Sequence, residues 1–417
     1  MKRYSEYKDS GISWLGQIPS HWQIEKINAH FKERRVKVSD KDYPALSVAK
    51  IGVVPQLDDA VKTDNGDNRK LVKEGDFVVN SRSDRKGSCG VAPQDGSVSL
   101  INIVLEVLDM NKQFIHLLMR SNNYIEEFYR NGRGIVADLW TTRYSEMKNI
   151  LIPIPPLEEQ EAIVEYLDSK TSKIDSYVAE RERELQSLEE LKQAEIAHIV
   201  TQGLNPNVPM RDSGIPWVGQ IPAHWDELKL SQVAKEHFIS NKDVHHQNLL
   251  SLSYGKIVRR DINATEGLLP ASFDTYQIVE PGNIVLRLTD LQNDQRSLRV
   301  GLAKEEGIVT SAYLALQVRD NIIPEYLYLY LHSADIHKYF YSLGSGIRQN
   351  LNFTGLRDIL IAIPPIEEQK AIVDYINAKI SKIDSLIADL TSQIEKLKEY
   401  KQRLISDVVT GQVDVRK

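Results

Sequence analysis

Cationic and amide side chains recur at matching places in the two halves of the chain, and each set follows a predicted short strand. An arginine guanidinium fits a phosphate or the O6 and N7 edge of guanine, while Asn and Gln side chains fit adenine. The residues at the matched strands are Asn80, Arg82, Arg85 and Lys86 in the first half, and Arg287, Arg296 and Arg299 in the second. Their types predict contacts to DNA phosphates and to base edges.

Three smaller groups extend this candidate set. They are the amides Gln292, Asn293, Gln295, Gln349 and Asn350, the basic cluster Lys256, Arg259 and Arg260, and the residues Arg133, Arg143 and Arg348 that flank two glycine turns. Taken alone, any one of these side chains is more simply a solvated surface charge. Recurrence in both halves favours DNA binding for the set and not for each member.

Catalytic motifs for phosphate loops, zinc proteases, serine hydrolases and dinucleotide binding are absent from the sequence. Residues 132–135 and 344–347 each contain two glycines without a third, which predicts tight turns and not a phosphate cradle. His245 and His246 have no cysteine nearby and only Asp243 as a close carboxylate. That environment favours a solvated loop over a metal site.

The segment DSGISWLGQIPSHW at 9–22 returns as DSGIPWVGQIPAHW at 212–225, and PPLEEQ at 155–160 returns as PPIEEQ at 364–369. A period this long indicates a duplicated unit of a lobe and a helix, not a solenoid repeat. The paired tryptophans of the first motif, Trp14 with Trp22 and Trp217 with Trp225, have the chemistry to stack on bases. An identical aromatic frame in lobes that otherwise diverge favours packing instead, where the segment docks onto the end of a long helix.

Bulk composition places the chain among ordinary soluble proteins. It has 417 residues, of which 41% are hydrophobic and 26% charged, and a net charge of −6. No apolar run approaches the roughly 18 residues of a membrane span, and the N-terminus lacks a signal-peptide core, so we expect a cytoplasmic protein with no membrane contact. Cys89 is the one cysteine, which excludes an internal disulfide.

Acidic charge is concentrated between residues 158 and 200, where twelve acidic and five basic side chains lie. The rest of the chain is therefore close to neutral. This balance permits local basic patches in the lobes, and it makes the acidic stretch a better surface for a protein partner than for DNA.

Two stretches, from 158 to about 200 and from 367 to about 409, contain neither Gly nor Pro. Each predicts a helix of about 43 residues, which needs a partner along its apolar seam. The second seam runs through Ile376, Ile380, Ile383, Ile387, Leu390, Ile394, Leu397, Leu404 and Val408, with an interruption at Lys401. The first runs through Ile174, Val178, Leu185, Leu188 and Leu191, with Arg181 where the second has Leu390. At each interruption the pair is expected to be open or to face a partner.

Short strands and helices predict mixed α/β lobes. Matched strands are expected at 77–80 and 284–287 and at 99–107 and 310–318, followed by short helices at 114–119 and 325–331. The lobes resemble each other at their edges and differ in the middle. Unlike ligands for the two middles would explain this distribution.

The W-x-G-x-I-P-x-H-W segment, the I-P-P-[LI]-E-E-Q entry into a long helix, and the duplication of both resemble the specificity subunit of type I restriction-modification systems. The resemblance covers essentially the whole chain. It implies an α+β fold with a pseudo-twofold internal repeat: two mixed α/β target recognition domains, separated by two long helices that pair as an antiparallel coiled coil. The implied boundaries are 1–155 and 204–364 for the recognition domains, and 156–203 and 365–417 for the helices.

The resemblance also implies a function. Each recognition domain would read one half of an asymmetric bipartite target in double-stranded DNA, and the helices would bind two modification subunits and set the spacer. The chain itself would be non-catalytic and would bind no cofactor. Adenine-N6 methyl transfer from S-adenosylmethionine would belong to the modification subunits, and ATP- and Mg²⁺-dependent translocation and cleavage to restriction subunits.

Two other classes of protein fit the sequence less well. A coiled-coil adaptor joining two peptide- or protein-binding lobes would share the helices, but it gives no reason for matched Arg-rich loops. A fused methyltransferase–nuclease would need motifs and several hundred residues that the sequence lacks.

Overall fold

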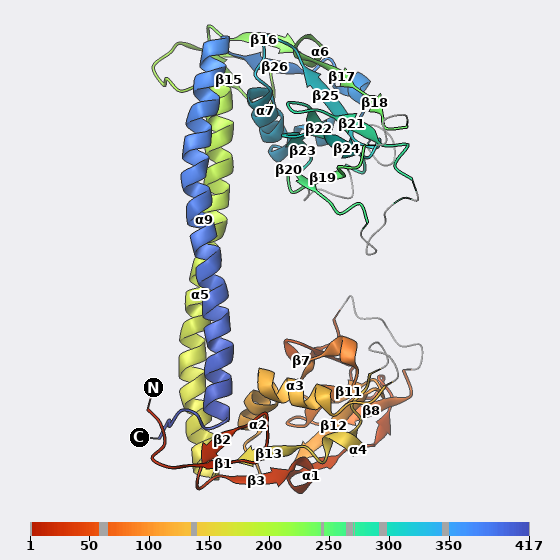
Figure 1. Cartoon of the computed structure of the whole chain (residues 1–417), viewed down its shortest axis with the longest axis vertical. Helices are drawn as coiled ribbons and strands as arrows, with labels where there is room; N and C mark the ends of the chain where they lie inside the picture. Colours follow the sequence, from red (N-terminus) through yellow and green to blue (C-terminus); the bar gives the residue numbers. More distant parts are fainter. Residues whose placement is uncertain are drawn as a thin grey trace. The chain divides into compact units, whose positions relative to one another are not determined.

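The computed structural model describes residues 2–57, 66–134, 140–242, 246–263, 270, 272–291, 298–343 and 350–416. The chain divides into two compact units, each with one lobe and half of each long helix (Figure 1). The first unit comprises residues 1–182 and 392–417, and the second comprises residues 183–391. Among the described residues, no helix is long and apolar enough to cross a membrane.

The first lobe is built on a four-stranded antiparallel sheet of order β10-β9-β12-β4 and a three-stranded sheet of order β11-β8-β5. The strands of these sheets are β4 (Phe31–Glu33), β5 (Lys37–Val38), β8 (Arg69–Val72), β9 (Phe77–Asn80), β10 (Cys89–Val91), β11 (Gly96–Val98) and β12 (Asn102–Val107). Three strand pairs complete it: β1 (Tyr7–Asp9) with β2 (Gln17–Pro19), β3 (Gln23–Lys26) with β13 (Leu151–Ile154), and β6 (Leu46–Ala49) with β7 (Gly52–Pro55). The short helices are α1 (Ile27–His30), η1 (Ser83–Arg85), α2 (Lys112–Met119), α3 (Asn122–Arg130) and α4 (Tyr144–Met147).

The second lobe repeats this topology strand for strand, with sheets of order β23-β22-β25-β17 and β24-β21-β18. Their strands are β17 (Ala234–His237), β18 (Ile239–Ser240), β21 (Gln277–Val279), β22 (Ile284–Leu286), β23 (Val300–Leu302), β24 (Gly307–Val309) and β25 (Leu314–Val318). The pairs are β14 (Met210–Asp212) with β15 (Gln220–Pro222), β16 (Asp226–Lys229) with β26 (Leu360–Ile363), and β19 (Leu250–Ser253) with β20 (Lys256–Arg259). The helices are α6 (Leu230–Val233), α7 (Pro324–Ile336), η3 (Tyr339–Ser342) and α8 (Phe353–Leu356).

The matched strands predicted from the sequence are present, and the structure shows that they are neighbours at the centre of each lobe. β9 pairs with β12, and β22 pairs with β25. Because both central strands are covered on both faces, they read as continuous apolar runs without alternation. The main cores of the two lobes form around them, with Phe77 and Ile284 fully buried.

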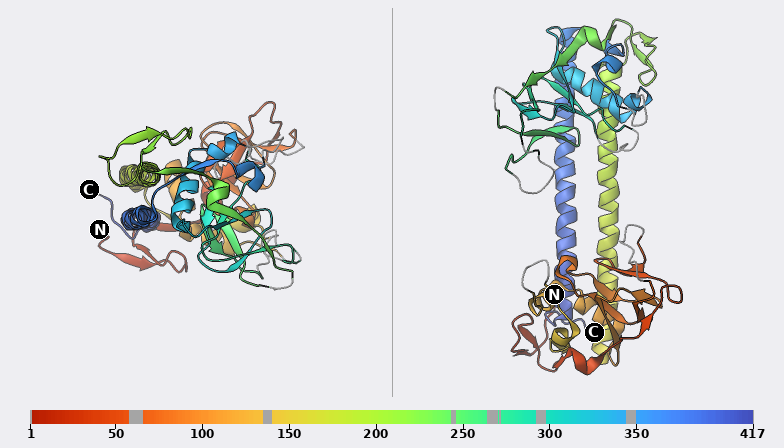
Figure 2. Two further views of the ribbon diagram at one scale, coloured as in Figure 1. Left: turned by 90° about the horizontal axis from the view of Figure 1, so that it is seen from above. Right: turned by 90° about the vertical axis from the view of Figure 1, so that its right-hand side faces the viewer.

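The two predicted long helices are α5 (Leu157–Gln202) and α9 (Ile366–Val409). They lie side by side in both units (Figures 1 and 2) and are joined by ion pairs. The pairs are Asp175–Lys401 at 2.6 Å and Glu182–Lys398 at 2.8 Å in the first unit, and Lys192–Asp384 at 2.5 Å and Glu195–Lys379 at 3.3 Å in the second. Partner numbers rise along one helix as they fall along the other, which establishes antiparallel pairing within each unit.

The apolar seam agrees with the prediction at most positions, including the buried Val178, Ile383 and Leu390. The prediction is wrong at Leu191, whose side chain is 51% exposed. The adjacent Lys192 turns toward the helix pair instead, because its ammonium group reaches Asp384 on α9. Lys401 does not open the pair, since its ammonium group binds Asp175 on α5.

The two repeated sequence motifs contact each other within each unit. The His21 imidazole lies 2.7 Å from the Glu159 carboxylate, and His224 lies 2.8 Å from Glu368. Beside these pairs, Gln160 and Gln369 donate to the carbonyls of Pro155 and Pro364, both at 2.9 Å. The same side-chain set therefore fixes the start of α5 on the first lobe and the start of α9 on the second.

The tryptophan segments pack against the opposite ends of the long helices. Trp22 and Trp225 are fully buried. A Cβ on Gly411, just after α9, would lie 3.1 Å from Trp22, and one on Gly203, just after α5, would lie 3.2 Å from Trp225. Packing is thus confirmed as the role of these two rings, and each lobe holds the start of one long helix and the end of the other. In the first unit this brings the chain ends together, where Asp414 N–H donates to the Lys2 carbonyl at 2.9 Å (Figure 2).

Candidate nucleic-acid interface

Three predicted segments of the first lobe are joined by one short piece of backbone. Thr141 forms β-bridges with both Arg82 and Arg133. Two further backbone bonds, from Ser83 N–H to the Trp140 carbonyl and from Thr142 N–H to the Ser81 carbonyl, extend this pairing. The loop after β9 and the glycine turn at 132–134 therefore form one surface.

The cationic side chains on this surface are exposed and only loosely paired. Arg82 and Arg85 share Asp84, at 3.2 and 3.7 Å, and Arg133 lies 3.9 Å from Glu146. Arg143, at the start of α4, is also exposed. Exposed ion pairs contribute only about 0–1 kcal/mol each, so an incoming phosphate can replace these carboxylates at little cost.

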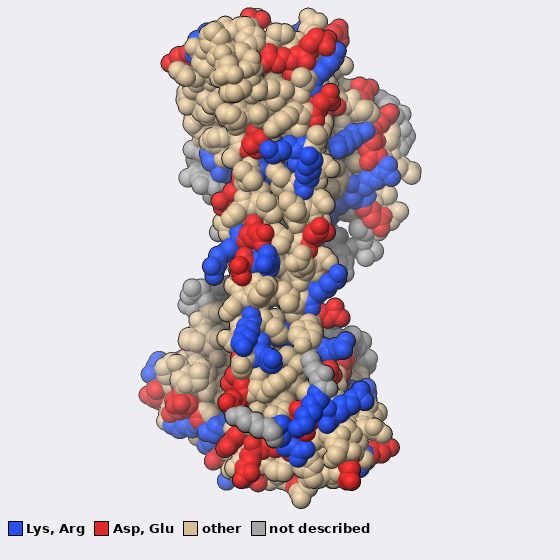
Figure 3. All heavy atoms as spheres, turned by 90° about the vertical axis from the view of Figure 1, so that its left-hand side faces the viewer, with Lys and Arg blue, Asp and Glu red and all other residues tan. Residues whose placement is uncertain are grey.

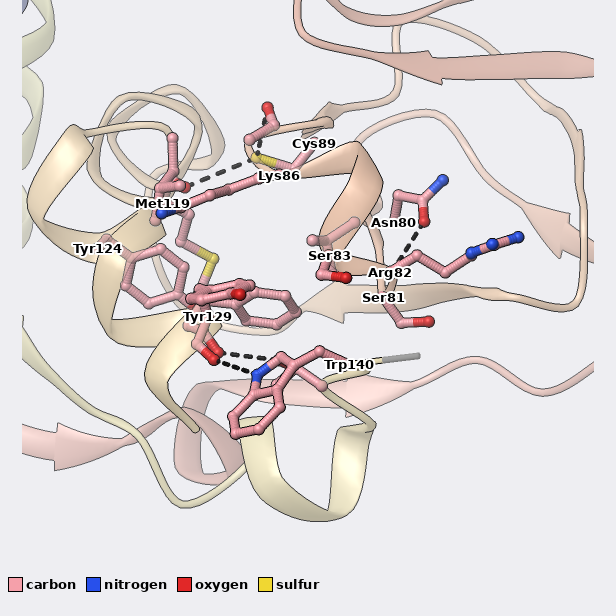
Figure 4. Close-up of a pocket in the computed structure, with 15 residues that line it drawn as sticks. Asn80, Ser81, Arg82, Ser83, Lys86, Cys89, Met119, Tyr124, Tyr129 and Trp140 are labelled. Atoms are coloured by element: carbon pink, nitrogen blue, oxygen red, sulfur yellow. Dashed lines mark hydrogen bonds between the residues drawn. The ribbon is translucent and has the colours of Figure 1, made fainter. Parts of the chain in front are cut away.

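A pocket at this surface is lined by aromatic and apolar side chains together with the polar candidates Asn80, Arg82 and Lys86 (Figure 4). The Trp140 ring lies 6.0 Å from Tyr129, and its indole N–H donates to the Tyr129 carbonyl at 2.8 Å. Lys86 lies 4.6 Å from the centre of the Tyr129 ring and 2.7 Å from Glu126. Trp140 thus anchors the backbone that carries Arg82, a role that the sequence did not reveal.

Gly132 is required for close approach to Trp140, because a Cβ there would lie 2.6 Å from the indole Cδ1. The Gly132 N–H donates to the Tyr129 carbonyl at 3.0 Å, three residues back, which agrees with the predicted tight turn. Residues 344–347 of the matching segment lie outside the described residues. Burial raises the pKa of Cys89, which also lines the pocket, to about 12, so its thiol stays protonated and is a poor nucleophile.

In the second lobe, Arg299 is a structural residue and the prediction that it contacts DNA is wrong. Its side chain is fully buried, and it donates to the carbonyls of Arg287 and Thr289 at 3.0 and 2.9 Å and to the Tyr341 hydroxyl at 3.0 Å. Its own backbone N–H binds the buried Asp335 carboxylate at 2.6 Å. A guanidinium enclosed in this way organises the loop after β22 and has no face left for a phosphate.

The other described candidates of the second lobe lie on two elements. Asn350 accepts the backbone N–H of Asp290 at 2.8 Å, which joins its segment to the loop that carries the half-buried Arg287. Lys256, Arg259 and Arg260 are exposed along and just after β20. Arg259 is bound by Glu305, and this hydrogen bond raises the pKa of the guanidinium and lowers that of the carboxyl group. The remaining candidates, Gln292, Asn293, Gln295, Arg296, Arg348 and Gln349, lie outside the described residues, as does His245.

No group of three or more His, Cys, Asp or Glu side chains within the described part of the chain is placed to hold a metal ion. Both lobes carry a loop after the matched central strand, with the exposed Arg82 and Arg85 after β9 and the half-buried Arg287 after β22. Together with the paired long helices, these loops define a duplicated protein with two lobes built on one frame. Residues 30–187 and 225–396 match the family of the type I restriction modification DNA specificity domain, and the chain belongs to that family.

Similar proteins agree with this assignment. The chain is 25% identical to the type I restriction enzyme MjaVIII specificity subunit of Methanocaldococcus jannaschii, over 96% of this chain and 95% of that protein. It is 20% identical to the EcoBI specificity subunit of Escherichia coli, over 73% and 66%. A solved structure from work on complex assembly and conformational transition of the type I R-M system has the same fold, with a TM-score of 0.69 at 15% identity, over 95% of this chain and 99% of that one.

Proposed function

We propose that each lobe of this specificity subunit reads one half of an asymmetric bipartite target in double-stranded DNA. The observation that carries the proposal is the matched position of the two central strands: the exposed Arg82 and Arg85 follow β9, and the half-buried Arg287 follows β22. The frame is the same in both lobes, while the side chains differ: Asn80, Arg82 and Arg85 in one, and Arg287 in the other. Because base discrimination depends on side-chain type, unlike residues on a common frame predict unlike half-sites.

The long helices are proposed to bind two modification subunits. Charge along them is mixed (Figure 3), since lysines of α9 pair with acids of α5. The helices also expose seven large apolar side chains: Leu157, Tyr177, Leu191, Ile366, Tyr375, Leu386 and Tyr400. Tyr177, Tyr375 and Tyr400 belong to a residue type that anchors protein interfaces, which supports docking of protein partners.

Methyl transfer from S-adenosylmethionine to adenine N6 is assigned to those modification subunits, and ATP- and Mg²⁺-dependent translocation and cleavage to restriction subunits. The role of this chain is to bind and position. The exposed apolar positions on the helices and the cationic side chains on the lobes fit a subunit that joins DNA to partner proteins.

The direct test is to co-express the chain with its modification subunit and to map methylated adenines across a host genome. One bipartite motif with a fixed gap is the expected result. A stable complex that methylates no such motif would refute the proposal. Arg133→Ala should then weaken methylation at the half-site that the first lobe reads, while leaving the complex intact.

Spacer setting can be tested with the same assay. Inserting seven residues into both α5 and α9 keeps the apolar seam in register. The insertion lengthens each helix by about 10 Å, which corresponds to roughly three base pairs of DNA. The gap is expected to lengthen while both half-sites keep their sequences. An unchanged gap in an active complex would refute the proposal that the helices set the spacer.

A further inference from the structure

Two matched β-hairpins present their tips at the same place in the two lobes. In β6–β7, Ala49 pairs with Gly52, and in β19–β20, Ser253 pairs with Lys256. Each hairpin therefore turns through two residues. The tips are Lys50-Ile51 in the first lobe and Tyr254-Gly255 in the second.

Both tips expose one large apolar side chain. Ile51 is 70% exposed and Tyr254 is 87% exposed, the two highest values among the large hydrophobic residues that the structure describes. A lone exposed apolar residue is common on protein surfaces. Here the exposure recurs at the same turn of two lobes whose sequences differ, which calls for a shared cause.

Each tip is held in place by a side chain from the helix behind it. Arg120, just after α2, donates to the Lys50 carbonyl at 2.7 Å and to the Cys89 carbonyl at 3.1 Å. Tyr328, on α7, donates its hydroxyl to the Gly255 carbonyl at 3.2 Å. The two tips are thus fixed by different chemistry from corresponding helices.

Both hairpins also cross a strand at a glycine, where a side chain would be crowded. A Cβ on Gly90 of β10 would lie 3.3 Å from the Gly52 Cα, and one on Gly301 of β23 would lie 2.6 Å from the Leu252 side chain. Such close approach packs the hairpin directly against the central sheet. Its tip is therefore pre-positioned for contact.

The turn in the second lobe places a tyrosine, Tyr254, in a left-handed backbone conformation that this residue type disfavours. Tyr254 has φ of 48° and Gly255 has φ of 73°. Positive φ at both central positions is the type I′ turn, for which Asn-Gly is preferred. A tyrosine in this left-handed conformation, with its ring in solvent, is better explained by a contact than by folding.

Each tip adjoins the loop that is proposed to bind DNA. Arg120 ties the first tip to Cys89, three residues beyond Lys86, and Gly255 packs against Leu298 at the end of the loop after β22. Exposed ammonium groups flank both tips, Lys50 in the first and Lys256 in the second. Each exposed apolar side chain therefore lies close to a cationic side chain.

We propose that these tips are DNA-contacting elements, in which Ile51 and Tyr254 pack apolar surface against the bases of the respective half-sites. This inference rests on the proposed function. Apolar side chains are known to contact thymine methyl groups and to wedge against base steps. Because one tip carries Ile and the other Tyr, the two contacts differ, as asymmetric half-sites require.

A partner protein is the alternative to DNA as the ligand of the second tip. Tyr254 also borders a groove whose opposite wall includes Glu189 and Glu190 of α5, within the same unit. A partner protein seated there would use Tyr254 without any DNA contact. The experiment therefore has to separate loss of DNA binding from loss of partner binding.

The test is Tyr254→Asn in the complex with the modification subunit. Asn-Gly suits this turn, so thermal stability is expected to be equal to or above wild type. Affinity for a duplex carrying the methylated motif should fall about tenfold, in the range of one lost base–aromatic contact. The slope of log affinity against log salt should stay unchanged, because no phosphate contact is removed.

Lys256→Gln is the matched comparison on the same hairpin, and it should lower that slope by about one. Wild-type affinity in Y254N, or a defect confined to association with the modification subunit, would overturn the inference. A wild-type complex that shows no preference for any bipartite duplex would instead refute the proposed function. The two failures are therefore distinguishable.

Discussion

Gly411→Ala tests whether the end of α9 is docked onto the first lobe through the tryptophan motif. Gly411 has φ of +79°, and a Cβ at this position would lie 2.8 Å from the Pro19 Cγ and 3.1 Å from the Trp22 ring. The substitution therefore adds left-handed strain of about 1–2 kcal/mol and overpacking of about 1–3 kcal/mol.

Gly16→Ala is the matched control in the same motif. Gly16 has φ of +64°, and its Cβ would meet nothing within 4 Å. This variant carries the strain without the overpacking. The difference between the two variants isolates the contact between the helix end and the lobe, and it is expected to be about 1–3 kcal/mol.

Urea unfolding of the full chain, followed by tryptophan fluorescence and circular dichroism, measures this difference. Both variants should lower the free energy of unfolding of the first unit, and G411A should do so by the larger amount. If G411A is no less stable than G16A, then the proposed packing of Trp22 against the helix end is wrong.

Two further predictions concern buried polar groups. Burial is the main cause that lowers the pKa of His116 to about 4, and its Nδ1 accepts the Val91 N–H. Because the unfolded chain takes up this proton first, acidification from pH 7 to pH 4 should remove about 3 kcal/mol of stability, a loss that His116→Gln should reduce in parallel urea titrations. Arg299→Met should destabilise the second unit by about 3 kcal/mol or more, since it leaves carbonyls without donors. The exposed Arg260→Met should change the unfolding free energy by less than about 0.5 kcal/mol, and equal effects of the two would contradict the structural role of Arg299.

The sequence predicted the elements whose causes are local. α5 and α9 follow from long stretches without Gly or Pro, and β9 follows from an apolar run that begins after a turn. Leu191 was wrongly predicted to lie in the apolar seam. Helical spacing from Leu188 allows either a three-residue step to Leu191 or a four-residue step to Lys192. Only the ion pair with Asp384 on the other helix decides between them.

Residues whose role depends on distant partners were beyond the sequence. Thr141 pairs with Arg82 across a separation of 59 residues and also with Arg133, which no spacing rule anticipates. Arg299 was grouped with Arg287 and Arg296 by residue type. Its burial depends on distant partners, because its backbone N–H binds Asp335 and its guanidinium binds the Tyr341 hydroxyl.

The repeated motifs have a physical reason to be alike while the middles of the lobes differ. His21 with Glu159 and His224 with Glu368 make the same contact, and Trp22 and Trp225 fill equivalent sites against Gly411 and Gly203. α5 and α9 each have to fit one lobe at the start and the other at the end. A change in one copy of a motif would therefore disrupt the helix contacts of one lobe and leave those of the other lobe intact. The middles carry no such shared obligation. Each is free to vary with the half-site that it is proposed to contact, provided that the glycine crossings at β10 and β23 keep the hairpin tips in place.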